Sequence, residues 1–234
     1  MAQVKFGGGI VAMSGKLAGN VFAKNRSGSY VRSWRKPVNP KSSRQVGART
    51  LVMYLAEQWG ESPMTDAIRT AWQTYASSFT WLNKLGEQIT LTGFNAFMQC
   101  NCALINAGGS IVTAAPTVLG LPPGDPTFAC TGSEATNLIS VVFDDTFDWC
   151  GEDDNYMAIF MGQPKPASHN FFATPYRFAA SIPGNTAVPI TSPQTLAAPF
   201  TLIEGQKIWT QARIIRADAR TSTRFNAVPF LAGA

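Results

Sequence analysis

The sequence predicts an α+β chain made of several parts, and three observations indicate this class. The first 50 residues hold ten Lys or Arg and no Asp or Glu, and Gly-rich breaks divide them into short β-favouring runs. Between about residues 43 and 107, apolar residues recur at helical spacing behind Ser and Thr capping residues. From residue 127 onward, short apolar or alternating runs separated by turn residues predict an antiparallel β-sandwich.

Residues 1–36 are predicted to form an extended, basic β-ribbon. Four β-favouring runs are its expected strands: Val4–Phe6, Ile10–Met13, Asn20–Ala23 and Ser29–Trp34. Ser27-Gly28 is expected to form the tight turn between the last two runs. Strand alternation places Tyr30, Arg32 and Trp34 on one face. Because a lone ribbon this basic is only marginally stable in water, we expect it to have a third strand or a partner.

The charge distribution predicts that this ribbon binds something outside its own core. Its positive charges repel one another, and residues 51–234 carry a net charge of −5. The expected targets are an acidic protein surface, a second copy of the chain or nucleic acid, and a solvated hairpin packed on its own body is the alternative. The candidate partner-binding residues are basic residues with two aromatic anchors: Lys24, Arg26, Tyr30, Arg32, Trp34, Arg35, Lys36 and Arg44.

Residues 37–113 are predicted to form a small helical domain. Pro37 and Pro40 end the ribbon, because proline cannot donate to a strand ladder. Three helices are expected: one capped by Ser42 or Ser43 and ending at Gly60, one capped by Thr65, and one from Gly93 to about Ala107 capped by Thr92. Their apolar positions include Val52, Leu55, Ala56 and Trp59 in the first, and Ile68, Ala71, Trp72, Tyr75 and Phe79 in the second. Because few residues join the first two helices, they are expected to pair as an antiparallel hairpin with both tryptophans between them.

The Pro- and Gly-rich residues 114–126 are predicted to be a linker, and residues 127–234 an immunoglobulin-like antiparallel β-sandwich. About seven short strands, with turn residues at short intervals, are typical of that architecture. The segments Glu204–Arg213 and Ala217–Ser222 resemble the F strand and the following turn of fibronectin type III domains. Trp209 stands where those domains usually have a tyrosine.

The sequence predicts no catalytic residues, no cofactor and no metal site, and the chain is expected not to be an enzyme. His169, the only histidine, lies in a loop without a nucleophile motif. The acidic residues between 144 and 154 lack the spacing of a calcium loop, so a calcium site, an acidic partner surface and solvated turns stay open. The four cysteines, Cys100, Cys102, Cys130 and Cys150, lack zinc-site spacing, and both free thiols and a Cys130–Cys150 disulfide bond are considered. No signal-peptide pattern and no run of 18 apolar residues is present, so we expect no export and no membrane association.

Three stretches resemble one family of proteins: GKLAGNVFAKNRSGSYVRSWRKPVNPKSSRQVGART, MTDAIRTAWQTYA and ITLTGFNAFMQCNCAL. The resemblance is to a family of small virion structural proteins encoded by tailed phages and prophages. It covers about residues 15–105. The matching positions are Gly15, Gly19, Arg32, Pro37, Asn39, Pro40, Gln45, Arg49, Trp72, Leu91, Thr92, Gly93, Phe94, Asn95 and Phe97.

The resemblance implies a structural component of a tailed-phage virion. The expected role is capsid decoration, as a cement protein that stabilises the shell through its N-terminal arm, and a neck or tail position is the alternative. The implied partners are the major capsid protein, other virion structural proteins and further copies of this chain, and the implied location is the virion after assembly in the host cytoplasm. Nucleic-acid binding through the ribbon is a further alternative. A third possible function is glycan binding or host contact by the sandwich, for which Trp149, Tyr156 or Trp209 would have to be exposed.

Overall fold

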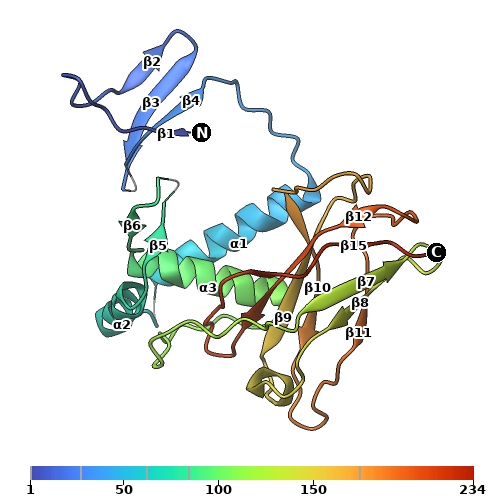
Figure 1. The fold of residues 1–234 in the computed structure, drawn as a ribbon. Coiled ribbons are helices and arrows are strands. Elements are labelled where there is room, and N and C mark those ends of the chain that lie inside the picture. The colour runs from blue at the N-terminus through green and yellow to red at the C-terminus, as the bar shows by residue number, and fades with distance from the viewer. Residues whose placement is uncertain (1, 27, 62, 84, 174) are drawn as a thin grey trace.

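The computed structural model describes residues 2–26, 28–61, 63–83, 85–173 and 175–234 of the chain. The fold is mixed and mostly β: three α-helices and several antiparallel sheets are present in these ranges. Figure 1 shows a small N-terminal sheet at one end of the molecule, the helices with a short two-stranded ribbon in the middle, and the sheets of residues 127–234 at the other end.

The N-terminal sheet contains β1 (Ala2–Gln3), β2 (Gly15–Leu17), β3 (Asn20–Asn25) and β4 (Gly28–Ser33), in the order β1-β4-β3-β2. Asn25 pairs with Gly28 across the predicted hairpin, and Ser27 lies outside the described residues. Ala18 and Gly19 join β2 to β3 with φ angles of +46° and +79°, as a tight hairpin turn requires.

Two of the four expected runs in this region are not strands. Val4–Phe6 and Ile10–Met13 are irregular, and the short strands β1 and β2 take their places in the sheet. Gly8 and Gly9, at φ +63° and +95°, turn the chain between the two runs. The pairing of β1 with β4 covers two residues, Ala2 and Gln3.

The helices are α1 (Ser43–Gly60), α2 (Asp66–Ser77) and α3 (Gly93–Ala107). Their predicted N-caps are confirmed, since the hydroxyls of Ser42, Thr65 and Thr92 each accept a hydrogen bond from the backbone N–H three residues later. Gly108 closes α3 in the left-handed conformation at φ +108°. A two-stranded ribbon, β5 (Trp81–Leu82) with β6 (Gln88–Ile89), lies between α2 and α3 in the chain.

Helix α3 is the common packing partner of the other two helices. Both α1 and α2 pack on α3, whereas the sequence predicted that α1 and α2 would pair with each other. Trp59 of α1 and Trp72 of α2 both contact Phe97 of α3, at ring-centroid distances of 5.3 and 5.5 Å. Gly93 lets α3 approach α2 closely, because a Cβ atom there would lie 2.8 Å from the backbone nitrogen of Gln73. The two tryptophans therefore meet on Phe97 and not on each other.

The C-terminal region holds two sheets that enclose one hydrophobic core. One has the order β11-β8-β7 and the other the order β10-β9-β13-β14. The bounds are β7 (Ala129–Ser133), β8 (Leu138–Val142), β9 (Tyr156–Gly162), β10 (Tyr176–Pro183), β11 (Gln194–Ala197), β13 (Thr210–Ile215) and β14 (Phe225–Asn226). A short pair, β12 (Lys207–Ile208) with β15 (Phe230–Leu231), and a 3-10 turn at Asp148–Gly151 complete the region. The core includes Ile139 and Val141 from the first sheet and Met157, Ile159 and Met161 from the second.

A second hydrophobic core joins the helices to the outer face of the sheet β10-β9-β13-β14. Tyr156 and Ala158 of β9 and Ile215 of β13 are buried in one cluster with Trp72 and Phe97 of the helices. The Ser181 hydroxyl of β10 also donates a 2.6 Å hydrogen bond to the carbonyl of Ala107 at the end of α3. Both faces of β9 are therefore covered, which explains its nearly uninterrupted apolar sequence YMAIFMG.

Candidate interaction surface

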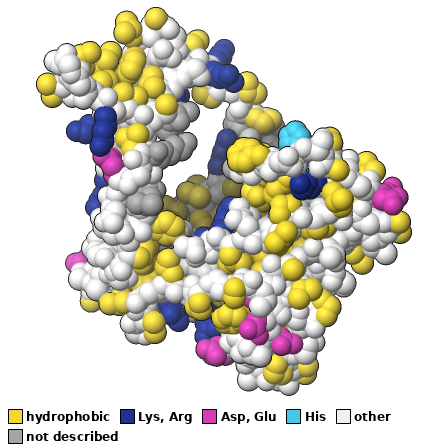
Figure 2. All heavy atoms as spheres, viewed as in Figure 1, with side chains coloured by type: hydrophobic (Ala, Val, Ile, Leu, Met, Phe, Trp, Pro, Cys, Tyr) yellow, Lys and Arg dark blue, Asp and Glu magenta, His cyan; other side chains and the backbone are white. Residues whose placement is uncertain are grey.

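The predicted partner-binding residues lie on the N-terminal sheet and on the segment that leads from it into α1. Most of these side chains are exposed, Tyr30 is partly buried, and Trp34 is 53% exposed. Dark blue Lys and Arg side chains appear on this part of the molecule in Figure 2. No Asp or Glu occurs before residue 57, so this positive charge is not balanced within its own segment.

Strand register decides which of these residues share a face. Val21 pairs with Arg32, and Ala23 pairs with Tyr30, so these side chains point to the same side of the sheet. Lys16 pairs with Val21 and so joins that side, where its ammonium lies 5.1 Å from the centre of the Trp34 ring. The predicted grouping of Tyr30, Arg32 and Trp34 is therefore confirmed. Lys16 was not among the predicted residues, because its strand is only three residues long and follows a glycine.

The other predicted residues are distributed around this face. Lys24 projects from the opposite side of the sheet. Arg26 lies at the hairpin end and borders a hollow beside β6. Arg35 and Lys36 lie in the extended segment after β4, and Arg44 lies in the first turn of α1. The structure thus places one cation–aromatic face at the centre of a wider basic region.

The opposite face of the sheet carries apolar side chains beside Lys24, and its central residues Phe22 and Val31 are partly buried. Phe22 pairs with Val31 there, and Leu17 is 59% exposed. In Figure 2 an opening separates the N-terminal sheet from the larger part of the molecule. Because the described apolar side chains of this small sheet are exposed or only partly buried, their burial against another surface would stabilise it.

Lys5 and Asn39, which flank strands of this sheet in the chain, contact the helical region through their side chains. The Lys5 ammonium lies 2.5 Å from a carboxylate oxygen of Glu87, beside the β5–β6 ribbon. Hydrogen bonds from Lys5, and next from Asn83, hold the pKa of Glu87 below its ordinary value. The Arg49 guanidinium of α1 donates a 2.9 Å hydrogen bond to the side-chain oxygen of Asn39, which fixes the proline-containing segment to α1. Both contacts are exposed, so each is expected to contribute little to stability.

Helix α1 extends the open surface with apolar side chains. Of its 18 residues, Leu55 is the one classed as fully buried. Of the predicted stripe, Val52 is 49% exposed and Ala56 is also exposed. Further exposed apolar side chains on this helix are Val46, Met53 and Tyr54. An amphipathic surface helix normally hides its apolar residues, so α1 offers an additional contact surface.

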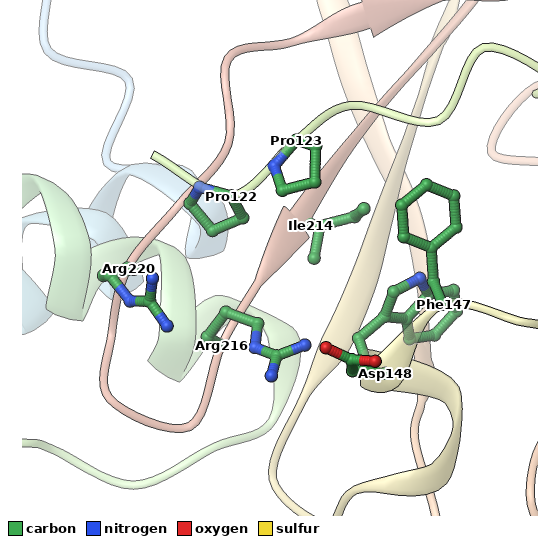
Figure 3. Close-up of a pocket in the computed structure, with 8 residues that line it drawn as sticks. Pro122, Pro123, Phe147, Asp148, Ile214, Arg216 and Arg220 are labelled. Carbon is green, nitrogen blue, oxygen red and sulfur yellow. The ribbon is translucent and has the colours of Figure 1, made fainter. Parts of the chain in front are cut away.

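The described residues show no grouping suited to metal binding, and Figure 3 shows a cavity whose lining includes Asp148, Arg216 and Arg220. This pocket of about 150 Å³ lies between Pro122–Pro123 and the end of β13. Arg216 forms a 2.7 Å ion pair with Glu152, and Arg220 forms one with Asp218 at the same distance. His169 is exposed in its loop. The expectation that the chain is not an enzyme stays a prediction.

The cysteine side chains are free thiols in the structure. Cys130 and Cys150 are both buried and unpaired, so the disulfide bond considered from the sequence is not formed. Burial raises the pKa of Cys130 to about 11 and that of Cys150 to about 12. For Cys100 burial likewise raises the pKa to about 12, while Cys102 is only partly buried. The buried thiols are therefore protonated at neutral pH and unreactive.

The rings considered for glycan or host contact are not exposed. Trp149 is 1% exposed, and Tyr156 and Trp209 are each 8% exposed. Trp209 is stacked on Phe172, with ring centroids 5.5 Å apart. These three rings are part of the packed interior and provide no platform for a sugar.

No family model, no curated protein and no solved structure matches this chain. Among the described residues, no helix combines the length and the apolar character needed to cross a membrane.

Proposed function

We propose that this chain is a structural component of a tailed-phage virion, a capsid decoration protein whose N-terminal arm (residues 1–36) binds neighbouring subunits. The observation that carries this proposal is a small sheet whose Lys and Arg side chains are exposed and whose described apolar side chains are exposed or only partly buried. The sequence resemblance of residues 15–105 supplies the class of assembly. A neck or tail position uses the same surface and is the second location.

Binding through this sheet would combine three kinds of contact. Lys16 and Arg32 beside Trp34 suit an acidic surface that also offers apolar contact area. The apolar face around Phe22 suits burial against a neighbour. The outer edge of β2 has no strand beside it in the described sheet, so a partner strand can add there by backbone hydrogen bonds. Repetition of such modest contacts over many subunits gives avidity.

The C-terminal region is proposed to be an immunoglobulin-like module that projects from the assembly or mediates self-association. Its support is the strand order, because the chain crosses between two sheets around one core after β8, after β10 and after β11. In the immunoglobulin constant-type arrangement the fourth strand belongs to the sheet of the first, second and fifth strands, whereas here the fourth strand β10 pairs with the third strand β9. Such a sandwich is a scaffold for contacts and implies no particular chemistry.

The test compares two charge-matched double variants in particle assembly. Arg32→Gln with Arg35→Gln removes two positive charges from the proposed surface, and Lys165→Gln with Lys207→Gln removes two from the body. We expect the first pair to lower occupancy on particles by roughly tenfold or more, because charge-assisted contacts to a partner are lost, and the control pair to bind like the unmodified protein. Equal occupancy for both pairs would refute the proposed surface.

Nucleic-acid binding by the same face is the second candidate function. The observation that favours it is the interleaving of Lys16 and Arg32 with Tyr30 and Trp34, since cations can contact phosphates while aromatic rings stack on bases. Fluorescence anisotropy with a single-stranded oligonucleotide tests it. Binding that weakens steeply with salt and is lost in Trp34→Ala supports this function. Absence of binding at low salt rejects it.

A further inference from the structure

A second pocket lies between α3 and the outer face of the sheet β10-β9-β13-β14, and its volume is about 430 Å³. Helix α3 contributes one stripe of side chains to it, with the spacing i, i+3, i+4 and i+7: Gln99, Cys102, Ala103 and Asn106. Because Cys102 and Ala103 are small, the helix does not fill the space above the sheet. The pocket is therefore a consequence of the sequence of α3.

The opposite wall is aromatic and basic. Phe160 of β9 pairs with Phe178 of β10, and their ring centroids are 5.7 Å apart. Arg213 of β13 pairs with Ala158 of β9, on the same side of the sheet as Phe160. The guanidinium of Arg224 lies over the Phe160 ring, 4.5 Å from its centre. All these side chains line the one cavity.

The two arginines face each other without a carboxylate. Ala212 pairs with Phe225, so continuing this register by one residue sets Arg224 opposite Arg213. Like charges directly across a strand pair are destabilising. None of the ion pairs between described residues includes Arg213 or Arg224, whereas Arg216 and Arg220 in the neighbouring pocket are each paired.

Arg213 also has an unsatisfied hydrogen-bond donor. Its Nε atom is buried, and no described group accepts a hydrogen bond from it. Burial, and after it the nearby Arg224, lowers the pKa of Arg213. A buried cation without a counter-ion is costly, and an anion placed between the two guanidinium groups would remove that cost.

We propose that this pocket binds a carboxylate carried on an apolar group, with the carboxylate between Arg213 and Arg224 and the apolar group against Phe160 and Phe178. Bidentate guanidinium contacts suit a carboxylate, and the aromatic wall favours an attached apolar group over a bare ion. A free aromatic or aliphatic acid and the carboxyl end of a peptide both have this chemistry. The proposal concerns a site remote from the N-terminal sheet and does not depend on the proposed virion function.

The test is titration calorimetry of the full chain with four probes: benzoate, N-acetylphenylalanine, N-acetylphenylalanine amide and inorganic phosphate. We expect both carboxylates to bind and the amide to bind roughly tenfold to a hundredfold more weakly, because it cannot replace the charged contacts. Tighter binding of N-acetylphenylalanine than of benzoate assigns the site to a peptide end, and the reverse order assigns it to a small acid. Carboxylates that bind no better than the amide or phosphate, or that do not bind, overturn the proposal.

Three variants locate the binding. Arg224→Gln changes an exposed side chain and should weaken carboxylate binding roughly tenfold or more. Ala103→Leu keeps a good helix former in α3 and should block the cavity. Arg177→Gln is the matched control, because Arg177 is also exposed and also lies 4.5 Å over a phenylalanine ring, that of Phe200, outside this pocket. Equal binding by the Arg224→Gln and Arg177→Gln variants would overturn the assignment.

Discussion

Replacement of Phe97 by alanine tests whether α3 holds the helical region together. Phe97 is 0% exposed, and its ring contacts both Trp59 and Trp72. Truncating a fully buried phenylalanine costs about 3–5 kcal/mol through lost burial and the cavity that remains. The two aromatic contacts place the expected loss in the upper part of this range, about 4–5 kcal/mol. That is a large fraction of the stability of a typical domain.

The assay is urea unfolding followed by tryptophan fluorescence and circular dichroism. Phe94→Ala is the matched control, because this residue lies on the same helix, is 36% exposed and makes one edge contact, with Trp59. We expect it to cost about 1 kcal/mol. A loss below about 1.5 kcal/mol for Phe97→Ala, or equal losses for the two variants, would refute the central position assigned to α3.

Three further predictions concern packing, thiols and pH. Gly93→Ala should destabilise the chain by about 1–3 kcal/mol in the same assay, because the new Cβ meets the backbone of α2. The control is Gly47→Ala, whose new Cβ has nothing within 4 Å and which should be neutral or stabilising. Equal effects of the two substitutions would contradict this prediction. In a thiol titration with Ellman's reagent, Cys102 should react first in the native protein and all four cysteines should react in urea; two unreactive cysteines in urea would instead indicate a disulfide bond. The pKa of Glu87 lies below its ordinary value of 4.5, so its ion pair with Lys5 stabilises the contact above that pH and is lost as the pH falls through the lowered value. The amide hydrogen-exchange rate of residues 81–89 should rise over that acid range in the unmodified protein but not in the Glu87→Gln variant. If the exchange rate of the unmodified protein does not rise there, the ion pair does not hold the contact.

Features that depend on neighbouring residues in the chain could be predicted from the sequence. The caps Ser42, Thr65 and Thr92 bond to N–H groups three residues away, so their identity was sufficient. Strand β9 (Tyr156–Gly162) is one of the short apolar runs between turn residues that are expected to form strands from residue 127 onward. The shared face of Tyr30, Arg32 and Trp34 follows from strand alternation alone.

Features that depend on distant contacts could not be predicted. The periodicity of α1 and α2 gives each an apolar stripe but does not say that α3 is the partner of both. Periodicity likewise indicated the apolar positions Val52, Leu55, Ala56 and Trp59 of α1 but not that Val52 and Ala56 are exposed, since it shows a face and not what covers it. Arg213 and Arg224 are eleven residues apart, and only the strand register together with the position of α3 brings them into one pocket.

The most direct test of the proposed function is cryo-electron microscopy of the assembly that this chain forms with its partners in cells that produce the whole particle. The proposal predicts that the N-terminal sheet lies against a neighbouring subunit, with Arg32 and Trp34 buried in the contact and carboxylates of the neighbour within ion-pair distance of Arg32 and Lys16. Many copies on a shell lattice would indicate decoration, and one ring or a stacked column would indicate a neck or tail position. An N-terminal sheet facing solvent, with contacts made only by residues 127–234, would contradict the account.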